Sequence, residues 1–193
     1  INIVVKNTVR MQTIIRDILA YSGVDSSKIP FEPVDLNEIF YEVSALLKND
    51  LQNNHVTLSA NSLPIVSGNR VQLTLLLQNL VGNGVKYNKN PAPQVVVSAN
   101  QEENDWIVSV QDNGIGIPPE NFAKIFDIFQ RLHTQDDFPG NSIGLAISRR
   151  VVERHGGQIW IESELNQGST FKFPFPGLEE TDPIKSMGPT RRR

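Results

Sequence analysis

Hydrophobic residues recur at three- and four-residue spacing along the first 22 residues, which predicts a single helix there. The apolar seam consists of Ile1, Val4, Met11, Ile15 and Ile18, with Thr8 in its one polar position. A seam that repeats about every 3.5 residues usually faces another helix. The pattern therefore favours half of a helical hairpin or of a dimer bundle, and the alternative is an amphipathic helix packed on its own domain.

Three more helices are predicted further along the chain. Residues 23–34 read as a linker because Gly, Ser and Pro are frequent there. A helix is then expected from Asp35 to about residue 52, and Glu38 stands at capping-box spacing from Asp35. A second helix is expected over 69–87, with Leu73, Leu77, Leu80 and Val81 on its core face. The last one covers 142–155 and ends at Gly156-Gly157.

The remaining apolar positions favour strands. Alternating or short apolar runs predict extended segments at 55–59, 63–66, 94–100, 106–111, 158–164 and 170–176. A hairpin turn is expected at 102–105, a short helix at 121–130 and a polar loop at 131–141. Antiparallel hairpins interleaved with helices predict an α+β fold, a two-layer sandwich whose mixed, mostly antiparallel sheet is covered on one face by about three helices, with the N-terminal helix added to it.

Composition narrows the functional classes. The 193 residues include no cysteine, so disulfides, thiolate metal sites and cysteine nucleophiles are excluded. The net charge of −3 argues against a nucleic-acid partner, and the apolar runs are too short to cross a bilayer. We expect a cytoplasmic fragment without membrane contact. Any membrane anchor of the intact protein would lie upstream of this chain. The charged, proline-rich residues 177–193 are expected to be a disordered tail.

Amide side chains gather on one side of the helix predicted over 69–87. Asn79, Asn83 and Lys86 fall within about 60° of one another on a helical projection, and Gln72 extends the same stripe. Amide oxygens can ligate Mg²⁺, amide NH₂ groups can donate to phosphate oxygens, and lysine adds a positive charge. Taken alone, the stripe is equally well read as a solvated helix face rich in asparagine.

Three glycine-bearing segments add candidate chemistry. Asp112 leaves a predicted strand into the loop 112–118, where it offers a carboxylate beside backbone that has no Cβ at alternate glycines. The segment 140–147 runs into a helix N-terminus, a natural phosphate site. The segment 168–171 enters the last strand. Each of them also has an ordinary reading, as a turn or as a helix cap.

The order of these segments resembles the ATPase domain shared by gyrase-type, Hsp90, MutL and histidine-kinase proteins, and most closely the histidine-kinase branch. Residues 78–87 match that family's N box, 112–116 the G1 box, 126–131 the F box, 140–145 the G2 box and 168–171 the final glycine–threonine motif. The resemblance covers about residues 1–175. It divides the chain into the second helix of a dimerisation hairpin (1–22), a linker (23–34), a catalytic ATP-binding domain (35–176) and the tail.

The resemblance implies a role for each matching residue around bound ATP. Asn83 would ligate Mg²⁺, while Asn79 and Lys86 would serve the phosphoryl transfer and contact the nucleotide together with Tyr87. Asp112 would recognise adenine. The other expected nucleotide contacts are Gly114, Gly116 and Ile117 in the G1 loop, Arg131 in a lid over 126–140, Gly140, Ser142, Gly144 and Leu145 in the G2 segment, and Thr170.

Two departures from the family pattern stand out. Ser142 replaces the second glycine that the G2 box usually has, which puts the behaviour of the lid in doubt. The phosphoacceptor histidine, usually followed by an acid in a helix, is absent: His55 precedes Val56, His133 precedes Thr134 and His155 precedes Gly156. Because the first hairpin helix would carry that histidine, we expect it upstream of Ile1, in a parent protein of which this chain is a fragment.

These implications predict a protein-histidine kinase of a two-component system that uses ATP and Mg²⁺. It would transfer the γ-phosphoryl group to a histidine for relay to a response-regulator aspartate, with its own dimerisation domain and a second copy as further partners. The fragment itself is expected to bind ATP without phosphorylating itself. One alternative is a nucleotide-sensing pseudokinase or protein-interaction module. Another is a gyrase- or Hsp90-type ATPase, which is disfavoured because Asn79 stands where those relatives have a glutamate base.

Overall fold

The computed structural model describes residues 2–26, 30–130 and 143–177. Its elements, in chain order, are α1 (Asn2–Ser26), β1 (Glu32–Asp35), α2 (Leu36–Leu46), α3 (Lys48–Asn53), β2 (Thr57–Ala60), β3 (Ile65–Gly68), α4 (Arg70–Lys86), β4 (Gln94–Glu102), β5 (Asp105–Asp112), the 3₁₀ turns η1 (Pro119–Asn121) and η2 (Lys124–Phe126), α5 (Gly144–Arg154), β6 (Trp160–Glu164) and β7 (Gly168–Pro176). None of the described helices is long and apolar enough to cross a membrane.

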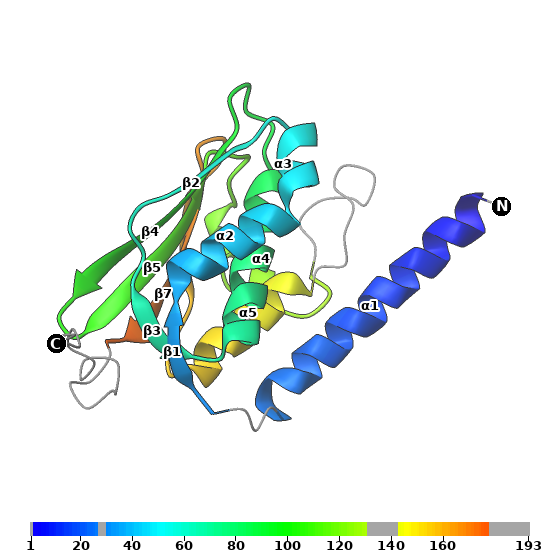
Figure 1. The fold of residues 1–193 in the computed structure, drawn as a ribbon. Helices are drawn as coiled ribbons and strands as arrows, with labels where there is room; N and C mark the ends of the chain where they lie inside the picture. The colour runs from blue at the N-terminus through cyan, green and yellow to red at the C-terminus, as the bar shows by residue number, and fades with distance from the viewer. Residues whose placement is uncertain (1, 27–29, 131–142, 178–193) are drawn as a thin grey trace, which may run out of the picture.

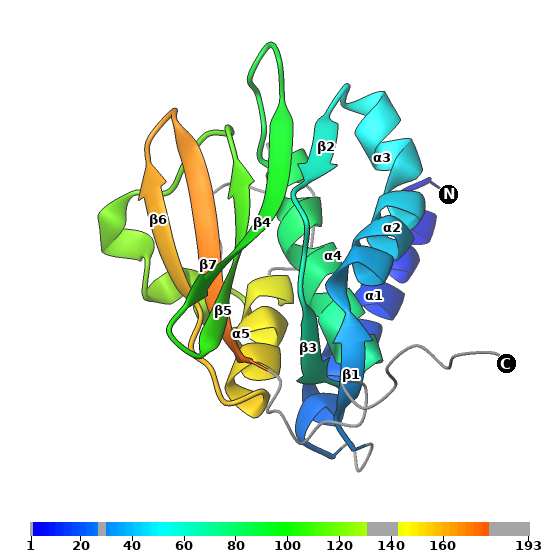
Figure 2. The same cartoon turned by 60° about the vertical axis from the view of Figure 1, so that its left-hand side comes forward.

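A five-stranded sheet in the order β2-β4-β5-β7-β6 forms one layer (Figure 2). Strand β2 runs parallel to β4, and the other neighbours are antiparallel. Helices α2, α4 and α5 cover one face of this sheet (Figures 1 and 2). The predicted two-layer α+β fold is therefore confirmed. A separate antiparallel pair, β1 with β3, joins the chain before α2 to the chain before α4, because Val34 and Val66 are buried opposite each other.

The core lies between the two layers and follows the period of each element. Alternate residues of the central strands point inward, as period-two strand geometry requires, and α4 contributes its apolar face. The buried set includes Val95, Val97, Val108, Val110, Phe171, Phe173 and Phe175 from the sheet and Leu73, Leu76, Leu77, Leu80 and Val81 from α4. All four residues that the sequence assigned to the core face of that helix are therefore buried.

Helix α1 extends four residues beyond the predicted boundary, into the predicted linker. Val24 is only 2% exposed, and its carbonyl accepts hydrogen bonds from Gln72 Nε2, at 3.0 Å, and from Arg154 Nη1. The Arg150 guanidinium lies 4.5 Å from the ring centroid of Tyr21. Contacts made by α4 and α5 thus hold a helical turn that contains glycine and that the local sequence does not favour.

Toward its N-terminus, α1 extends away from the sheet and from the helices that cover it (Figure 1). Its apolar side chains at Met11, Ile15, Ile18 and Leu19 are between 46% and 66% exposed. Three of them belong to the predicted seam, which is exposed at these residues, whereas Ile14, Ala20 and Tyr21 outside the seam pack against the domain core. The helix that would cover the seam in a hairpin or dimer bundle stays a prediction.

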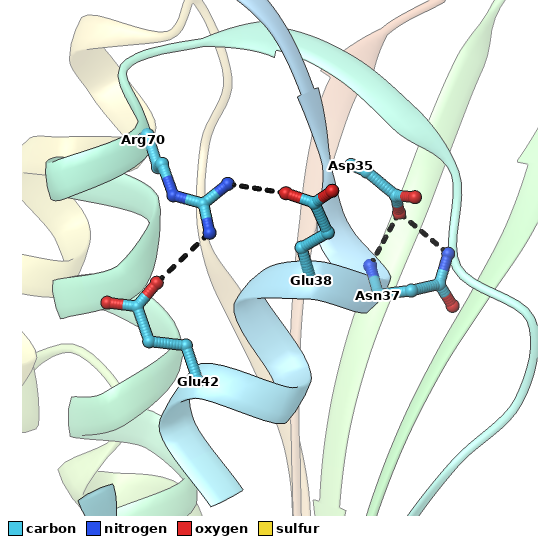
Figure 3. Close-up of polar contacts among 5 residues, drawn as sticks. All are labelled: Asp35, Asn37, Glu38, Glu42 and Arg70. Atoms are coloured by element: carbon cyan, nitrogen blue, oxygen red, sulfur yellow. Dashed lines mark hydrogen bonds and ion pairs between the residues drawn. The ribbon is translucent and has the colours of Figure 1, made fainter. Parts of the chain in front are cut away.

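Figure 3 shows how α2 is held against α4. Asp35 is the helix N-cap as predicted, and its Oδ1 accepts the Asn37 backbone N–H at 2.8 Å. The expected capping-box partner, Glu38, instead pairs with Arg70 at 2.7 Å, and Arg70 also reaches Glu42 at 3.2 Å. An arginine placed between two glutamates satisfies both carboxylates, so Glu38 does not turn back to the cap.

Two predicted helices are divided. The helix expected to run to about residue 52 breaks at the buried Leu47, whose φ of −94° and ψ of 7° separate α2 from α3. The short helix expected over 121–130 is instead the pair of 3₁₀ turns η1 and η2. Phe126 sits edge-on to Phe171, at 6.4 Å between ring centroids, and its burial holds this turn against the sheet.

Candidate functional site

Three members of the predicted stripe, Asn79, Asn83 and Lys86, lie half-buried along the C-terminal part of α4. Gln72 does not belong with them. It is only 6% exposed and donates to Val24 of α1, because α1 docks on the N-terminal turn of α4. The half-buried amide stripe is therefore shorter than the sequence indicated and begins at Asn79.

Asn79 connects α4 to the start of α5. Its Nδ2 donates to the carbonyl oxygen of Gly144 at 3.3 Å, and a Cβ at Gly144 would lie 3.2 Å from Asn79 Oδ1. The close approach brings the amide stripe next to a helix N-terminus, where backbone N–H groups and the helix dipole favour an anion. Leu145 follows, half-buried and packed against the core.

Lys86 and Tyr87 end α4 as a pair. Lys86 Nζ donates to the Tyr87 hydroxyl at 2.7 Å and lies 4.3 Å from the centroid of the tyrosine ring. The Tyr87 carbonyl accepts the N–H of Ile115 at 3.0 Å, so this pair is tied to the loop that follows β5. The arrangement places a cation beside the glycine loop.

Asp112 is the most perturbed acid of the described chain. Burial raises its pKa to about 6, and hydrogen bonds from the backbone N–H groups of Gly114 and Ser169 partly oppose the shift. The Gly114 bond, to Asp112 Oδ1, is 2.8 Å long. A largely buried carboxylate with a raised pKa is typical of a functional group, and it can accept a hydrogen bond from a ligand.

Glycines after Asp112 allow the backbone to pack closely. A Cβ at Gly114 would lie 2.4 Å from the carbonyl oxygen of Tyr87, and one at Gly116 would lie 2.0 Å from the carbonyl oxygen of Glu164. Gly116 also has a φ of 69°, in the left-handed region that favours glycine. The loop therefore lies directly against α4 on one side and against the end of β6 on the other.

Two serines support this loop: Ser163, which the sequence did not single out, and Ser169 of the predicted segment 168–171. Ser163 Oγ accepts the N–H of Ile117 at 2.8 Å and donates to the carbonyl of Gly168 at 2.8 Å, while Ser169 Oγ lies 2.9 Å away. The two serines face each other in register between β6 and β7. Thr170 follows, half-buried and opposite Gln111 of β5.

An asparagine-rich segment after α4 also went unrecognised in the sequence. Asn88 and Asn90 bond to Asn113, the residue that follows Asp112. The clue was present in the repeated amides of residues 88–90, but their partner lies more than twenty residues away and depends on the path of the loop.

The structure brings together most of the predicted site. Asn79, Asn83, Lys86, Tyr87, Asp112, Gly144 and Thr170 lie on α4, at the end of β5, at the start of α5 and on β7. Arg131, Gly140, Ser142 and most of the predicted lid fall outside the described residues. Within the described ranges, no group of three or more His, Cys, Asp and Glu side chains could hold a metal ion.

Comparisons with known proteins find a matching family and sequence relatives of this chain. The sequence profile described as histidine kinase-, DNA gyrase B-, and HSP90-like ATPase matches residues 68–179. Phytochrome-like protein Cph1 of Synechocystis is 41% identical over 166 residues, which cover 86% of this chain and 22% of that protein. Cyanobacterial phytochrome A of Nostoc is also 41% identical over 166 residues, again 22% of its length. The chain thus spans about a fifth of these relatives.

Solved structures of histidine kinases are also similar to this chain. Full-length ShkA in complex with AMPPNP superposes with a TM-score of 0.73 at 27% identity, covering 86% of this chain and 35% of that one. Histidine kinase ThkA in complex with response regulator protein TrrA gives a TM-score of 0.72 at 28% identity, covering 94% of this chain and 51% of ThkA.

Proposed function

Because the chain belongs to the histidine kinase-, DNA gyrase B- and HSP90-like ATPase family, we propose that it is the ATP-binding catalytic part of a two-component sensor histidine kinase. The observation that carries the proposal is the buried Asp112 carboxylate, held by two backbone N–H groups beside the amide stripe of α4. The AMPPNP complex of ShkA supports ATP as the ligand.

We infer that the adenine base of ATP binds at Asp112. A carboxylate that already accepts backbone N–H groups has remaining lone pairs, and an adenine amino group supplies the matching donor. Gly114, Gly116 and Ile117 would shape the base pocket, and Thr170 would support its water structure. Because Asp112 is largely buried, this hydrogen bond would distinguish adenine from bases that present an oxygen there.

The phosphates would extend toward the junction of α4 and α5. Lys86 would supply positive charge, and the N-terminus at Gly144 and Leu145 would supply backbone donors. Asn83 has an amide oxygen of the kind that Mg²⁺ accepts when phosphate oxygens and water provide its other ligands, so the residues present fit the ion. Arg131, Gly140 and Ser142 would complete the phosphate side.

The reaction would need little covalent chemistry from the protein. In-line phosphoryl transfer is promoted by positioning and by neutralising charge, which Asn79, Lys86 and a bound Mg²⁺ would provide. Asn79 is an amide committed to the Gly144 carbonyl, and it cannot take a proton from water. Rapid hydrolysis of the gyrase type is therefore not expected.

The proposed partners follow from α1 and from the relatives. The exposed apolar residues of α1 would pack in a dimerisation hairpin, giving a homodimer in the intact protein, with the short segment between α1 and β1 as the linker to the catalytic domain. The complex of ThkA with TrrA supports a response regulator as the downstream partner.

A calorimetric titration with Mg-ATP tests the proposal. The unmodified chain should bind ATP saturably, and Asp112→Asn should weaken binding about tenfold or more, because a hydrogen bond to a charged acceptor in the site is lost. Asp105→Asn, at the exposed opposite end of the same strand, is the matched control and should bind like the unmodified chain. Equal affinity of Asp112→Asn and the unmodified chain would contradict the assignment.

Incubation of the same chain with labelled ATP should leave no stable phosphohistidine. His155 is 4% exposed, its Nδ1 donates to Val151 O at 2.7 Å, and its Nε2 accepts the Asn69 N–H at 3.1 Å. With both nitrogens engaged, His155 cannot attack a phosphoryl group, and neither His55 nor His133 is followed by an acid, as the family's acceptor histidine usually is. Acid-labile phosphate on the isolated chain would contradict this expectation.

A further inference from the structure

Asn113 lies at the centre of a hydrogen-bond network at the edge of the site. Its Oδ1 accepts from Asn88 Nδ2 and from the Gln94 backbone N–H, both at 2.8 Å, and its Nδ2 donates to the Ala92 carbonyl at 2.9 Å. Its own carbonyl oxygen accepts from Asn90 Nδ2 at 3.3 Å. One half-buried side chain therefore ties three points of the loop between α4 and β4 to the end of β5.

This network is adjacent to the adenine-binding carboxylate proposed above. Asp112 Oδ1 accepts the N–H of Gly114, which forms a side-chain turn with Asn113 as its central residue. The chain on either side of Asn113 is fixed as well, because Asp112 pairs with Val95 and the Ile115 N–H bonds to Tyr87. Movement of Asn113 would move the carboxylate and the N–H group that orients it together.

The chemistry of the side chain matches the position. Asparagine presents a double acceptor and a donor from one planar amide, and here both functions are used. Aspartate could accept but would set a negative oxygen against the Ala92 carbonyl, and leucine could do neither. A purely apolar or charged residue would therefore leave part of the loop unpaired.

We propose that Asn113 is a positioning residue for nucleotide selection: through its amide, the 88–93 loop holds the Asp112 turn in the orientation that accepts the adenine amino group. The inference rests on the proposed nucleotide site. It goes further in assigning base selectivity to a residue that need not touch the nucleotide and to the asparagine-rich loop behind it.

The test compares ATP with inosine triphosphate, which carries a carbonyl oxygen where adenine carries its amino group. Calorimetric titrations in Mg²⁺ would use the whole chain and the variants Asn113→Ala and Asn100→Ala, the latter replacing an exposed asparagine on β4 as the matched control. Asn113→Ala should lower ATP affinity about tenfold while inosine triphosphate changes less than about twofold, since only the hydrogen bond to the amino group depends on the Asp112 orientation. Asn100→Ala should change neither.

The outcomes distinguish a failure of the proposed ATP site from a failure of the role assigned to Asn113. If the unmodified chain binds neither nucleotide, the proposed function fails and the inference fails with it. If the unmodified chain prefers ATP and Asn113→Ala weakens both nucleotides equally or not at all, the inference alone is overturned. Thermal unfolding checks each variant, and should Asn113→Ala not fold, Asn88→Ala removes one of the three bonds and should reduce the ATP preference about threefold. An unchanged preference in Asn88→Ala would then overturn the inference.

Discussion

Helices α4 and α5 carry polar groups at both of their ends, but the two ends treat those groups differently. At the end that meets α1, most of the polar groups hydrogen-bond to one another or to the Val24 carbonyl; these groups belong to His155, Asn69, Gln72 and Arg154. At the other end, Asp112 and the amide stripe remain half-buried with capacity for a ligand. Polar residues of similar type are therefore paired within the protein at one end, while at the other they are the residues that we propose bind the nucleotide.

The comparison predicts that changes at the α1 end alter stability and leave nucleotide affinity nearly intact. His155→Ala should have the largest effect, lowering the free energy of unfolding by about 3 kcal/mol, because a buried ring and two hydrogen bonds are lost. The ring stacks on Phe31 at 4.4 Å and meets Phe175 edge-on. Chemical denaturation measures the loss, with the exposed His55→Asn as control. A large loss of ATP affinity at unchanged stability would break the comparison.

Arg154→Ala should have the next largest effect, about 1.5 kcal/mol, confined to the docking of α1. The variant removes one donor to the Val24 carbonyl and a positive charge at the C-terminus of α1. Hydrogen exchange of the amides at 22–26 should become about tenfold faster, since 1.4 kcal/mol corresponds to a factor of ten. Arg149→Ala, on the same helix but paired with Glu153, should leave these amides unchanged. Equal acceleration in both variants would show that the docking contact is not specific.

Asp112→Asn should show the reverse at the nucleotide end: it weakens ATP binding but stabilises the fold, by about 1 kcal/mol at pH 8. Burial raises the pKa of Asp112 from 3.8 to about 6, so stability is lost as the pH rises through this interval and the carboxyl ionises. The asparagine variant avoids that loss, and its advantage should disappear near pH 4. Thermal unfolding across pH measures it, with Asp105→Asn as control. A destabilised Asp112→Asn at pH 8 would contradict the cost assigned to burial.

His155 provides the opposite pH dependence at the other end. Burial lowers the pKa of His155 below 6.5, so its contribution to stability is complete above that value and declines as the pH falls and the ring becomes protonated. The His155→Ala variant should therefore lose less of its stability than the unmodified chain between pH 7 and pH 5.

Gln72→Leu should have the smallest effect, within about 1 kcal/mol. Among the described residues, Gln72 Oε1 is buried without a hydrogen-bond partner, so leucine removes an unpaired oxygen as well as the bond to Val24. Denaturation compared with Gln78→Leu, at a half-buried site on the same helix, measures the difference. A loss of several kcal/mol would mean that Gln72 contributes more than this one bond.

The sequence was informative where local chemistry decides the structure. Helix α4 was predicted to within one residue at each end, because its apolar period is long and Asn69 caps it. The hairpin between β4 and β5 followed from its polar turn. The candidate site residues were recognisable because their order along the chain carries the resemblance to the family.

Contacts between distant segments explain what the sequence did not reveal. The extra turn of α1 depends on Gln72 and Arg154, and nothing near Gly23 indicates it. The break at Leu47 has no glycine or proline to announce it. Ser163 and Asn113 acquire their partners from strand register and loop path, which the local pattern of polar residues does not contain.

The last turn of α1 also sets how far the catalytic domain can reach. A helix advances about 1.5 Å per residue and an extended chain about 3.3 Å, so unwinding the four residues from Gly23 to Ser26 would lengthen the connection by about 7 Å. Gln72 and Arg154 hold this turn at Val24, so loss of both contacts would be needed before the longer connection could form. Two side chains, one on α4 and one on α5, thus set the length of the connection between α1 and the rest of the domain.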